Sequence, residues 1–175
     1  LRISNHSTPQ AIAALHETTA DFAVVTTPVQ YIASLLQTNV QNIQEVAVCS
    51  PRFQDMLDRV IPLADLRKHP LITLGADTQS YAFYSAFFAA HDLPFRPDIE
   101  AFTADQILPM VESGLGIGII PKDFIRPSDK VCVINLAEQF PPRSVCLVKR
   151  KDQPLGFAAR ELEKMIIESG KTVSD

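Results

Sequence analysis

The stretch Asp105–Pro121, DQILPMVESGLGIGIIP, predicts a short amphipathic helix, a glycine turn and a buried strand, in that order. Apolar residues recur at helical spacing and predict one apolar face for residues 104–113, made of Ile107, Leu108, Met110, Val111 and Leu115. Gly114 follows where helices commonly end in a left-handed residue, and Ile117–Pro121 reads as a short β-branched strand.

The glycines of this stretch, Gly114, Gly116 and Gly118, are in the wrong context for a phosphate-binding loop. A dinucleotide fingerprint requires strand, glycines and helix in that order, so that the phosphate meets a helix N-terminus. Here the helix precedes the strand. We therefore interpret the glycines as positions that allow a tight turn and close backbone packing.

The rest of the chain alternates predicted strands and helices, which indicates an α/β architecture with mainly parallel sheets. The expected strands are residues 1–5, 21–27, 43–49, 71–74, 99–102, 130–135 and 144–149. The expected helices are residues 8–18, 51–57, 79–91 and 155–169, with helical turns near Leu35–Leu36, at 63–68 and at 123–125. We expect the aromatic residues of 79–91 to be core, Ala158, Leu162, Met165 and Ile166 to face inward, and Gly170 to end the last helix.

Composition excludes several classes of protein. The 175 residues suffice for one domain or two small lobes, and a net charge of −4 gives no electrostatic footprint for DNA or an anionic membrane. No apolar run approaches the roughly 20 residues of a spanning helix, and we see no leader of signal-peptide type. The cysteines, Cys49, Cys132 and Cys146, are odd in number and lack C-x-x-C spacing, which favours a reducing cytoplasm over a disulfide framework or a zinc site.

No catalytic constellation is recognisable, so we expect no enzyme, no cofactor and no metal. The histidines, His6, His16, His69 and His91, lie beside predicted helix ends and lack zincin spacing. Ser113 precedes a glycine but lacks the strand-to-helix context of a nucleophile elbow. The basic run Lys149–Lys151 follows a strand and reads as a solvated rim.

Three separated patches resemble the effector-binding domain of LysR-type transcriptional regulators. The first is the apolar helix that runs into ESGLGIGIIP. The second, Val145–Glu168, is similar to the family's closing strand, basic pair and final helix, and the third, Leu1–Val25, to its second strand, second helix and following strand. The resemblance therefore covers nearly the whole chain, and the order and separation of the patches carry it.

This resemblance implies a two-lobed, periplasmic-binding-protein-like (type II) fold with a ligand in the interlobe cleft. The chain would cross between the lobes near Glu45–Cys49 and Ser144–Val148. Lobe I would comprise residues 1–45 plus 145–175, and lobe II residues 46–144. The implied function is effector sensing: a small, often anionic molecule enters the cleft and controls DNA binding by the full-length protein. A free-standing solute-binding protein of the same fold is the alternative.

The expected ligand contacts are hydroxyls and an aromatic ring at strand ends and helix starts: Thr26, Thr27, Thr78, Ser80, Phe102 and Thr103. Thr78 and Ser80 lie at a predicted helix N-terminus, where the dipole favours an anion. The resemblance implies ligand-contacting hydroxyls at positions matching Thr26, Thr27 and Thr103. For each residue, ordinary capping or turn chemistry is the competing interpretation.

The family's first strand–helix unit and its helix-turn-helix DNA-binding domain have no counterpart in this sequence. We therefore expect that this chain alone does not bind operator DNA and that its ligand affinity is weakened. The family implies a homodimer or tetramer for the full-length protein, which would contact DNA through the domain not represented here.

Overall fold

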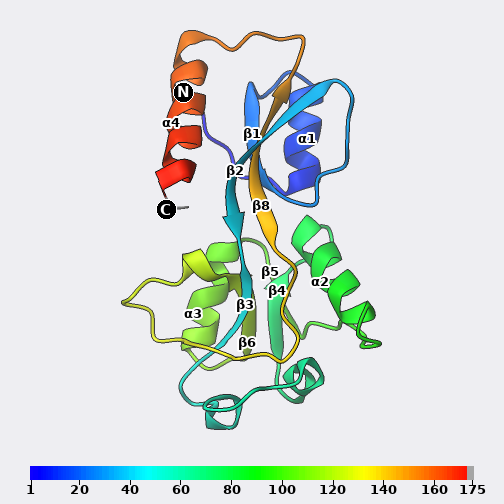
Figure 1. Cartoon of the computed structure of the whole chain (residues 1–175), viewed down its shortest axis with the longest axis vertical. Coiled ribbons are helices and arrows are strands. Elements are labelled where there is room, and N and C mark those ends of the chain that lie inside the picture. The colour runs from blue at the N-terminus through cyan, green and yellow to red at the C-terminus, as the bar shows by residue number, and fades with distance from the viewer. Residues whose placement is uncertain (173–175) are drawn as a thin grey trace. The chain divides into compact units, whose positions relative to one another are not determined.

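The computed structural model describes residues 1–172, which divide into two compact units (Figure 1). Unit 1 comprises Leu1–Ile43 and the chain from Arg143 onward, and unit 2 comprises Gln44–Pro142. The chain thus passes from one unit to the other at residues 43–44 and 142–143. The boundaries predicted for the two lobes were 45–46 and 144–145, with crossings near Glu45–Cys49 and Ser144–Val148.

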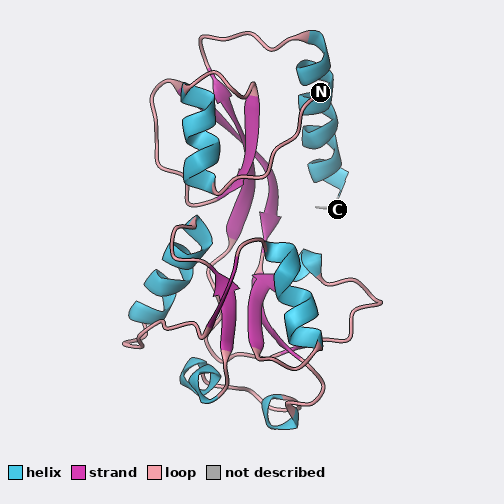
Figure 2. Cartoon of the chain, turned by 180° about the vertical axis from the view of Figure 1, so that it is seen from behind, coloured by secondary structure: helices cyan, strands magenta, loops and turns pink. Residues whose placement is uncertain are grey.

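Unit 1 is a three-stranded antiparallel sheet with a helix on either side (Figures 1 and 2). Its elements are α1 (Thr8–His16), β1 (Phe22–Thr26), β2 (Leu35–Ile43), β8 (Arg143–Arg150) and α4 (Phe157–Thr172). The strand order is β1-β8-β2, so that the last strand of the chain lies between the first two. Helix α1 packs against β1, and α4 packs against β2.

The start of α1 has the chemistry that its sequence predicts. Ser7 is the N-cap, Pro9 lies in the first turn, and the Ser7 backbone N–H donates to Gln10 Oε1 at 3.0 Å. Ala11 and Leu15 are buried in a cluster with Val25 and Cys146. This cluster occupies one face of the unit 1 sheet, because β1 and β8 contribute alternate residues to it.

Helix α4 differs from its prediction in both its end and its face. Gly170 does not end the helix: it is buried within α4, where an added Cβ would collide with the Val40 carbonyl of β2. Ala158 and Met165 were expected to face inward, but both are exposed, and Met165 is 65% accessible. Leu162 and Ile166 are half-buried as expected, and the close approach at Gly170 fixes which face of α4 meets β2.

Unit 2 contains a five-stranded mixed sheet in the order β5-β4-β6-β3-β7. Its strands are β3 (Glu45–Cys49), β4 (Leu71–Leu74), β5 (Ile99–Ala101), β6 (Ile117–Pro121) and β7 (Cys132–Val133). Strand β4 pairs in parallel with β5 and β6, whereas β3 pairs antiparallel with β6 and β7. The α/β class is therefore confirmed, but among the described strands parallel pairing is confined to β5-β4-β6.

The helical segments of unit 2 cover both faces of this sheet. They are α2 (Gln79–Ala89), α3 (Ile107–Glu112) and the 3-10 turns η1 (Gln54–Met56), η2 (Leu63–Lys68), η3 (Ala104–Gln106) and η4 (Lys122–Phe124). Tyr84, Phe87 and Phe88 of α2 are buried in one cluster, as the aromatic pattern predicted. Ile107 and Val111 of α3 belong to another, and alternate residues of β3, β4 and β6 divide between the two.

The stretch 105–121 has the predicted order of helix, turn and strand. Gly114 has a φ of +81°, which explains the glycine at this helix end. A Cβ on Gly118 would lie 2.7 Å from Ile107 Cγ2, so this glycine lets α3 pack closely on β6. Leu115 was expected on the apolar helix face, but it follows the turn and is 52% exposed.

Several predicted elements are wrong because the backbone partner that decides them is distant in sequence. Residues 1–5 form no strand, and none of the described strands pairs with them. Leu35 and Leu36 begin strand β2 instead of a helical turn, because β8 pairs along its whole length. The expected helix at 51–57 is reduced to the single turn η1.

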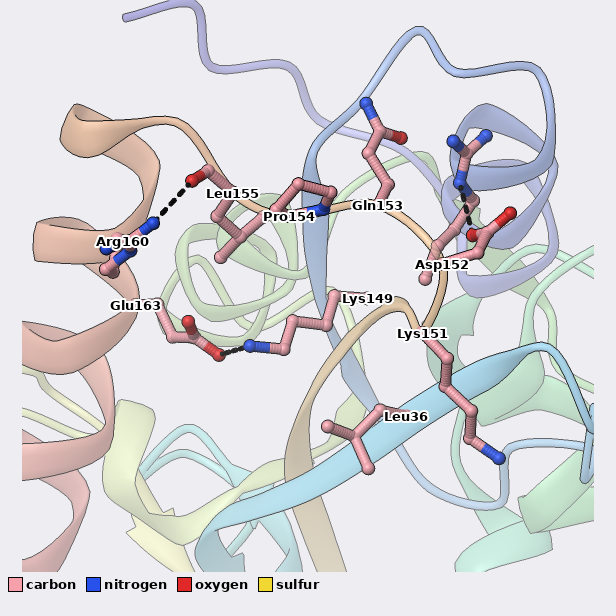
Figure 3. A pocket seen from close by; sticks show the side chains of 10 residues that line it. Leu36, Lys149, Lys151, Asp152, Gln153, Pro154, Leu155, Arg160 and Glu163 are labelled. Carbon is pink, nitrogen blue, oxygen red and sulfur yellow. Dashed lines mark hydrogen bonds and ion pairs between the residues drawn. The ribbon is translucent and has the colours of Figure 1, made fainter.

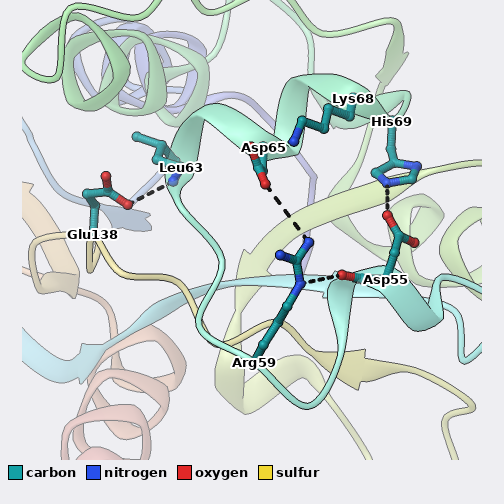
Figure 4. Close-up of polar contacts among 7 residues, drawn as sticks. All are labelled: Asp55, Arg59, Leu63, Asp65, Lys68, His69 and Glu138. Atoms are coloured by element: carbon teal, nitrogen blue, oxygen red, sulfur yellow. Dashed lines mark hydrogen bonds and ion pairs between the residues drawn. The ribbon is translucent and has the colours of Figure 1, made fainter.

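A polar network fixes the irregular segment that contains η1 and η2 (Figure 4). His69 Nε2 lies 2.9 Å from Asp55 Oδ2, and Arg59 Nε donates to the Asp55 carbonyl at 2.9 Å. The Glu138 carboxylate accepts from the Leu63 backbone N–H at 2.8 Å. The bonds made by Arg59 and Glu138 satisfy backbone groups of this irregular segment, at Asp55 and Leu63.

Candidate functional site

The carboxyl ends of β4 and β5 bring four of the six predicted site residues to one edge of the unit 2 sheet. Leu74 and Ala101 are register partners, and the Gly75 N–H donates to the Ala101 carbonyl at 3.3 Å. The chain after β4 leads to Thr78 and Ser80, and the chain after β5 is Phe102–Thr103. Ligands of open α/β sheets commonly bind at such an edge, where parallel strands end.

Helix α2 begins at this edge of the unit 2 sheet. Thr78 is its N-cap: Thr78 Oγ1 accepts from the Tyr81 N–H at 3.2 Å and donates to the Gly75 carbonyl at 2.8 Å. Ser80 lies in the first turn of the helix. The Thr78 hydroxyl therefore performs capping chemistry, and the dipole of this eleven-residue helix favours an anion near its start.

The end of β5 is held by a residue that the sequence analysis did not single out. Gln106 Oε1 accepts from the backbone N–H groups of Phe102, at 2.9 Å, and of Thr103, at 3.2 Å. Thr103 is the N-cap of η3 in a capping box with Gln106. The spacing Thr-x-x-Gln is the signal that predicts this contact. The arrangement leaves the Phe102 side chain 87% exposed beside the strand end.

The remaining predicted residues, Thr26 and Thr27, end strand β1 in unit 1 and are held by the start of β8. Arg143 Nη2 donates to Thr26 Oγ1 at 2.9 Å, and Arg143 Nε donates to the Thr27 carbonyl at 2.6 Å. The Ser144 N–H donates to Thr27 Oγ1 at 2.8 Å. Arg143 is buried and had no local sequence signal, because its partners lie far away in the chain.

Each unit therefore carries hydroxyl groups at strand ends. In unit 1 the Arg143 guanidinium lies beside Thr26 and Thr27, and in unit 2 the N-terminus of α2 lies beside Thr78 and Ser80. The dipole at the start of α2 favours an anion or a polar small molecule near that helix end. Among residues 1–172, no group of three or more His, Cys, Asp and Glu side chains is arranged to hold a metal ion.

Comparison with known proteins identifies the family. The model of the LysR substrate binding domain matches residues 1–171. The chain belongs to this family. A relative, the uncharacterized HTH-type transcriptional regulator YwbI of Bacillus subtilis (strain 168), is 43% identical over 70 residues. That match spans 38% of this chain and 23% of YwbI, so it covers a minor part of each protein.

Solved structures share the fold of this LysR substrate-binding domain. The regulatory domain of CcmR from Synechocystis PCC6803, in complex with 2-PG, has a TM-score of 0.80 at 14% identity. The match covers 94% of this chain and 80% of that one. The effector-binding domain of QuiR, in complex with shikimate, also has a TM-score of 0.80, at 17% identity, over 95% of this chain and 79% of that one. The two-lobed type II fold expected from the sequence is thereby supported. The family match over residues 1–171 favours a domain of a LysR regulator over a free-standing solute-binding protein.

A cavity of about 500 Å³ in unit 1 of the LysR domain contains none of the predicted site residues (Figure 3). It lies between α4 and the ends of β2 and β8, and its lining includes the basic run Lys149–Lys151. These cations lie near acceptors: Lys149 Nζ is 2.6 Å from Glu163 Oε1, Arg150 Nε is 3.4 Å from Asp152 Oδ1, and Lys151 Nζ donates to the Ala33 carbonyl. We therefore do not assign the effector to this cavity.

The LysR domain shows no helix, within the part of the chain described, that combines the length and apolar character required to cross a bilayer.

Proposed function

We propose that this chain is the effector-sensing domain of a LysR-type transcriptional regulator. The effector is a small, anionic molecule that binds at strand ends and helix starts. Its contacts are Thr26, Thr27, Thr78, Ser80, Phe102 and Thr103. The observation that carries the proposal is the family match over residues 1–171. Effector binding stabilises one arrangement of the domain through its differential affinity, and the regulator transmits that bias to DNA.

The preference for an anion follows from the two local geometries. The N-terminus of α2 supplies a positive dipole end beside Thr78 and Ser80, and Arg143 supplies a cation beside Thr26 and Thr27. Phe102 offers an exposed ring for the apolar part of the same molecule. The complexes of CcmR with 2-PG and of QuiR with shikimate support a small molecule as the ligand class.

The wider role belongs to the same proposal. The full-length regulator acts in the cytoplasm as a homodimer or tetramer and contacts DNA through a helix-turn-helix domain. The relation to YwbI, an HTH-type transcriptional regulator, supports this assignment.

Thermal unfolding of the full-length regulator with small carboxylates, amino acids, phosphate and sulfate tests the proposal. A ligand that binds only the folded state, present at a free concentration of 100 times its Kd, adds about 2.7 kcal/mol to the unfolding free energy. The unfolding midpoint therefore rises with ligand concentration. We expect Thr103→Val and Thr27→Val to abolish the rise and Thr103→Ser, which keeps the hydroxyl, to retain it. A rise that survives both valine substitutions would move the effector elsewhere.

Thr38→Val is the matched control, because Thr38 is a half-buried threonine of β2 outside the six site residues. It makes the same chemical change on a strand that tolerates β-branched residues. The ligand-dependent rise should be unaltered in this variant. Absence of any rise across the panel, with a folded wild-type protein, contradicts sensing of these ligand classes.

A further inference from the structure

Two of the three cysteines, Cys49 and Cys132, are directly opposite each other in the unit 2 sheet. They are register partners in the antiparallel pair β3–β7. Register partners of an antiparallel pair point to the same face, so the two thiols are neighbours. Both side chains belong to or pack against the cluster that contains Phe88 and Met56, which is consistent with a shared face.

The spacing of the two backbones fits a disulfide. The Ile134 N–H donates to the Ala47 carbonyl, and hydrogen-bonded pairs alternate along an antiparallel ladder, so Cys49–Cys132 is a hydrogen-bonded pair. Such pairs have Cα atoms about 5.5 Å apart, within the range of roughly 4.4–6.8 Å seen across disulfides. The Cβ atoms need to approach by about 1 Å or more, because such pairs place them up to about 5.5 Å apart and a disulfide requires about 3.5–4.5 Å.

Strand β7 is able to make that adjustment. It is two residues long and lies at the edge of the sheet, paired only with β3 among the described strands. Residues 126–131, which precede it, form turns and irregular backbone. Movement of β7 toward β3 therefore breaks no ladder to another described strand.

The environments of the two thiols differ. Cys49 is fully buried, whereas Cys132 is partly exposed. Burial, followed by the neighbouring Cys132 and Asp55, raises the pKa of the Cys49 thiol to about 11. Cys49 therefore stays protonated near neutral pH, and Cys132 is the thiol that an oxidant reaches first.

We propose that Cys49 and Cys132 are a site of reversible oxidative modification, at which a peroxide converts the facing thiols into an intramolecular disulfide. The Cys132 thiolate attacks a peroxide oxygen, the O–O bond breaks, and a sulfenic acid forms as hydroxide takes up a proton and leaves as water. The Cys49 sulfur then attacks the sulfenic sulfur, its proton leaves with the hydroxyl as a second water, and the S–S bond forms. Two thiols and one hydrogen peroxide give one disulfide and two waters. A dithiol reductant reverses the reaction.

This inference goes beyond effector sensing and does not depend on it. The disulfide would tie the edge strand β7 to β3 and thereby fix the return segment that carries Glu138 and Phe140 toward β8. Cys146, buried in unit 1 on β8, has no cysteine partner in its sheet and serves as an internal reference.

Differential alkylation with peptide mass mapping tests the proposal on the reduced, folded chain treated with hydrogen peroxide. We expect the Cys49 and Cys132 peptides to become linked, Cys146 to remain a free thiol, and dithiothreitol to restore all three thiols. The Cys146→Ser variant should form the same link, whereas Cys132→Ser should not. Recovery of Cys49 as a free thiol while Cys132 proceeds to sulfinic acid, or linkage through Cys146, would overturn the proposal.

The unfolding midpoint supplies a second readout that needs no variant of the buried Cys49. A cross-link between residues distant in sequence constrains the unfolded chain, so oxidation should raise the midpoint by several degrees and reduction should return it. The Cys132→Ser variant, altered at a partly exposed position, should show no such difference. An oxidised wild-type protein with a midpoint equal to or below that of the reduced form would contradict a disulfide that fits the native sheet.

Discussion

The sheet of unit 2 carries a buried apolar cluster on each face, whereas the sheet of unit 1 carries one such cluster and leaves apolar residues exposed on its other face. In unit 2, Ala47 and Val48 are successive residues of β3 and belong to different clusters. In unit 1, Val25 is buried beside α1, but Val24 is 46% exposed. Leu36, on the same face as Val24, is 44% exposed.

This difference shows the limit of interpreting a continuous apolar run as a doubly buried parallel strand. The run FAVV in β1 and the run IGII in β6 have similar composition. Strand β6 pairs with β4 in parallel and is buried from Ile117 to Ile120, whereas β1 is an antiparallel edge strand in which Val24 is exposed. The apolar run identifies a strand in both cases, and the packing partners decide its burial.

Truncation of Phe88 should give the largest effect, because it removes a fully buried ring from the larger cluster of unit 2. We expect Phe88→Ala to lower the unfolding free energy by about 3–5 kcal/mol. Phe157→Ala is the matched control in unit 1, since the Phe157 ring is 81% exposed, and it should change the value by less than about 0.5 kcal/mol. Urea denaturation followed by circular dichroism measures both. Equal losses would mean that the two units differ less in packing than their burial indicates.

The next largest effect on the unfolding free energy should come from substitution of a glycine in unit 2, compared with one in unit 1. A Cβ on Gly118 meets Ile107 Cγ2 at 2.7 Å and Val111 Cγ2 at 2.8 Å, so Gly118→Ala forces α3 away from β6. We expect a loss of about 1–3 kcal/mol from this overpacking. A Cβ on Gly156 of unit 1 meets no atom within 4 Å, so Gly156→Ala should be neutral or stabilising by up to about 1 kcal/mol. The same denaturation measurement compares the pair, and a neutral Gly118→Ala would show that α3 is loosely packed.

The parts of the fold that were predicted correctly carry local signals. Helix α2 has its cap at Thr78 and an aromatic stripe, and the stretch 105–121 has a helical face followed by Gly114. Strand β2 was missed because its polar sequence becomes a strand only by pairing with β8, which closes the domain from the far end of the chain. Gly170 was misassigned for the same reason, since only the fold brings Val40 against it.

The residues of the candidate site also differ in whether the local sequence carried a signal for them. The six residues at strand ends and helix starts were proposed from local patterns, and their role as ligand contacts stays a prediction. Arg143, which binds the end of β1, and the facing pair Cys49–Cys132 had no local signal, because their partners are distant in sequence. Spacing along the chain therefore identified capping residues well and cross-strand chemistry poorly.

The smallest effect on the unfolding free energy should come from the ion pairs of α4. Two of these pairs differ in burial and allow a comparison within unit 1. Lys149 and Glu163 are 24% and 13% exposed and lie 2.6 Å apart, whereas Lys164 and Glu168 are 66% and 62% exposed and lie 3.9 Å apart. We expect Glu163→Gln to lower the unfolding free energy by about 1 kcal/mol, and Glu168→Gln by less than about 0.5 kcal/mol, because solvent screens the exposed pair. Denaturation in low and high salt measures both variants. If the loss of unfolding free energy in Glu163→Gln vanishes in high salt, Lys149–Glu163 is a solvated surface pair, as the sequence predicted for the basic run. If the loss persists in high salt, the pair is part of the packing between α4 and the sheet.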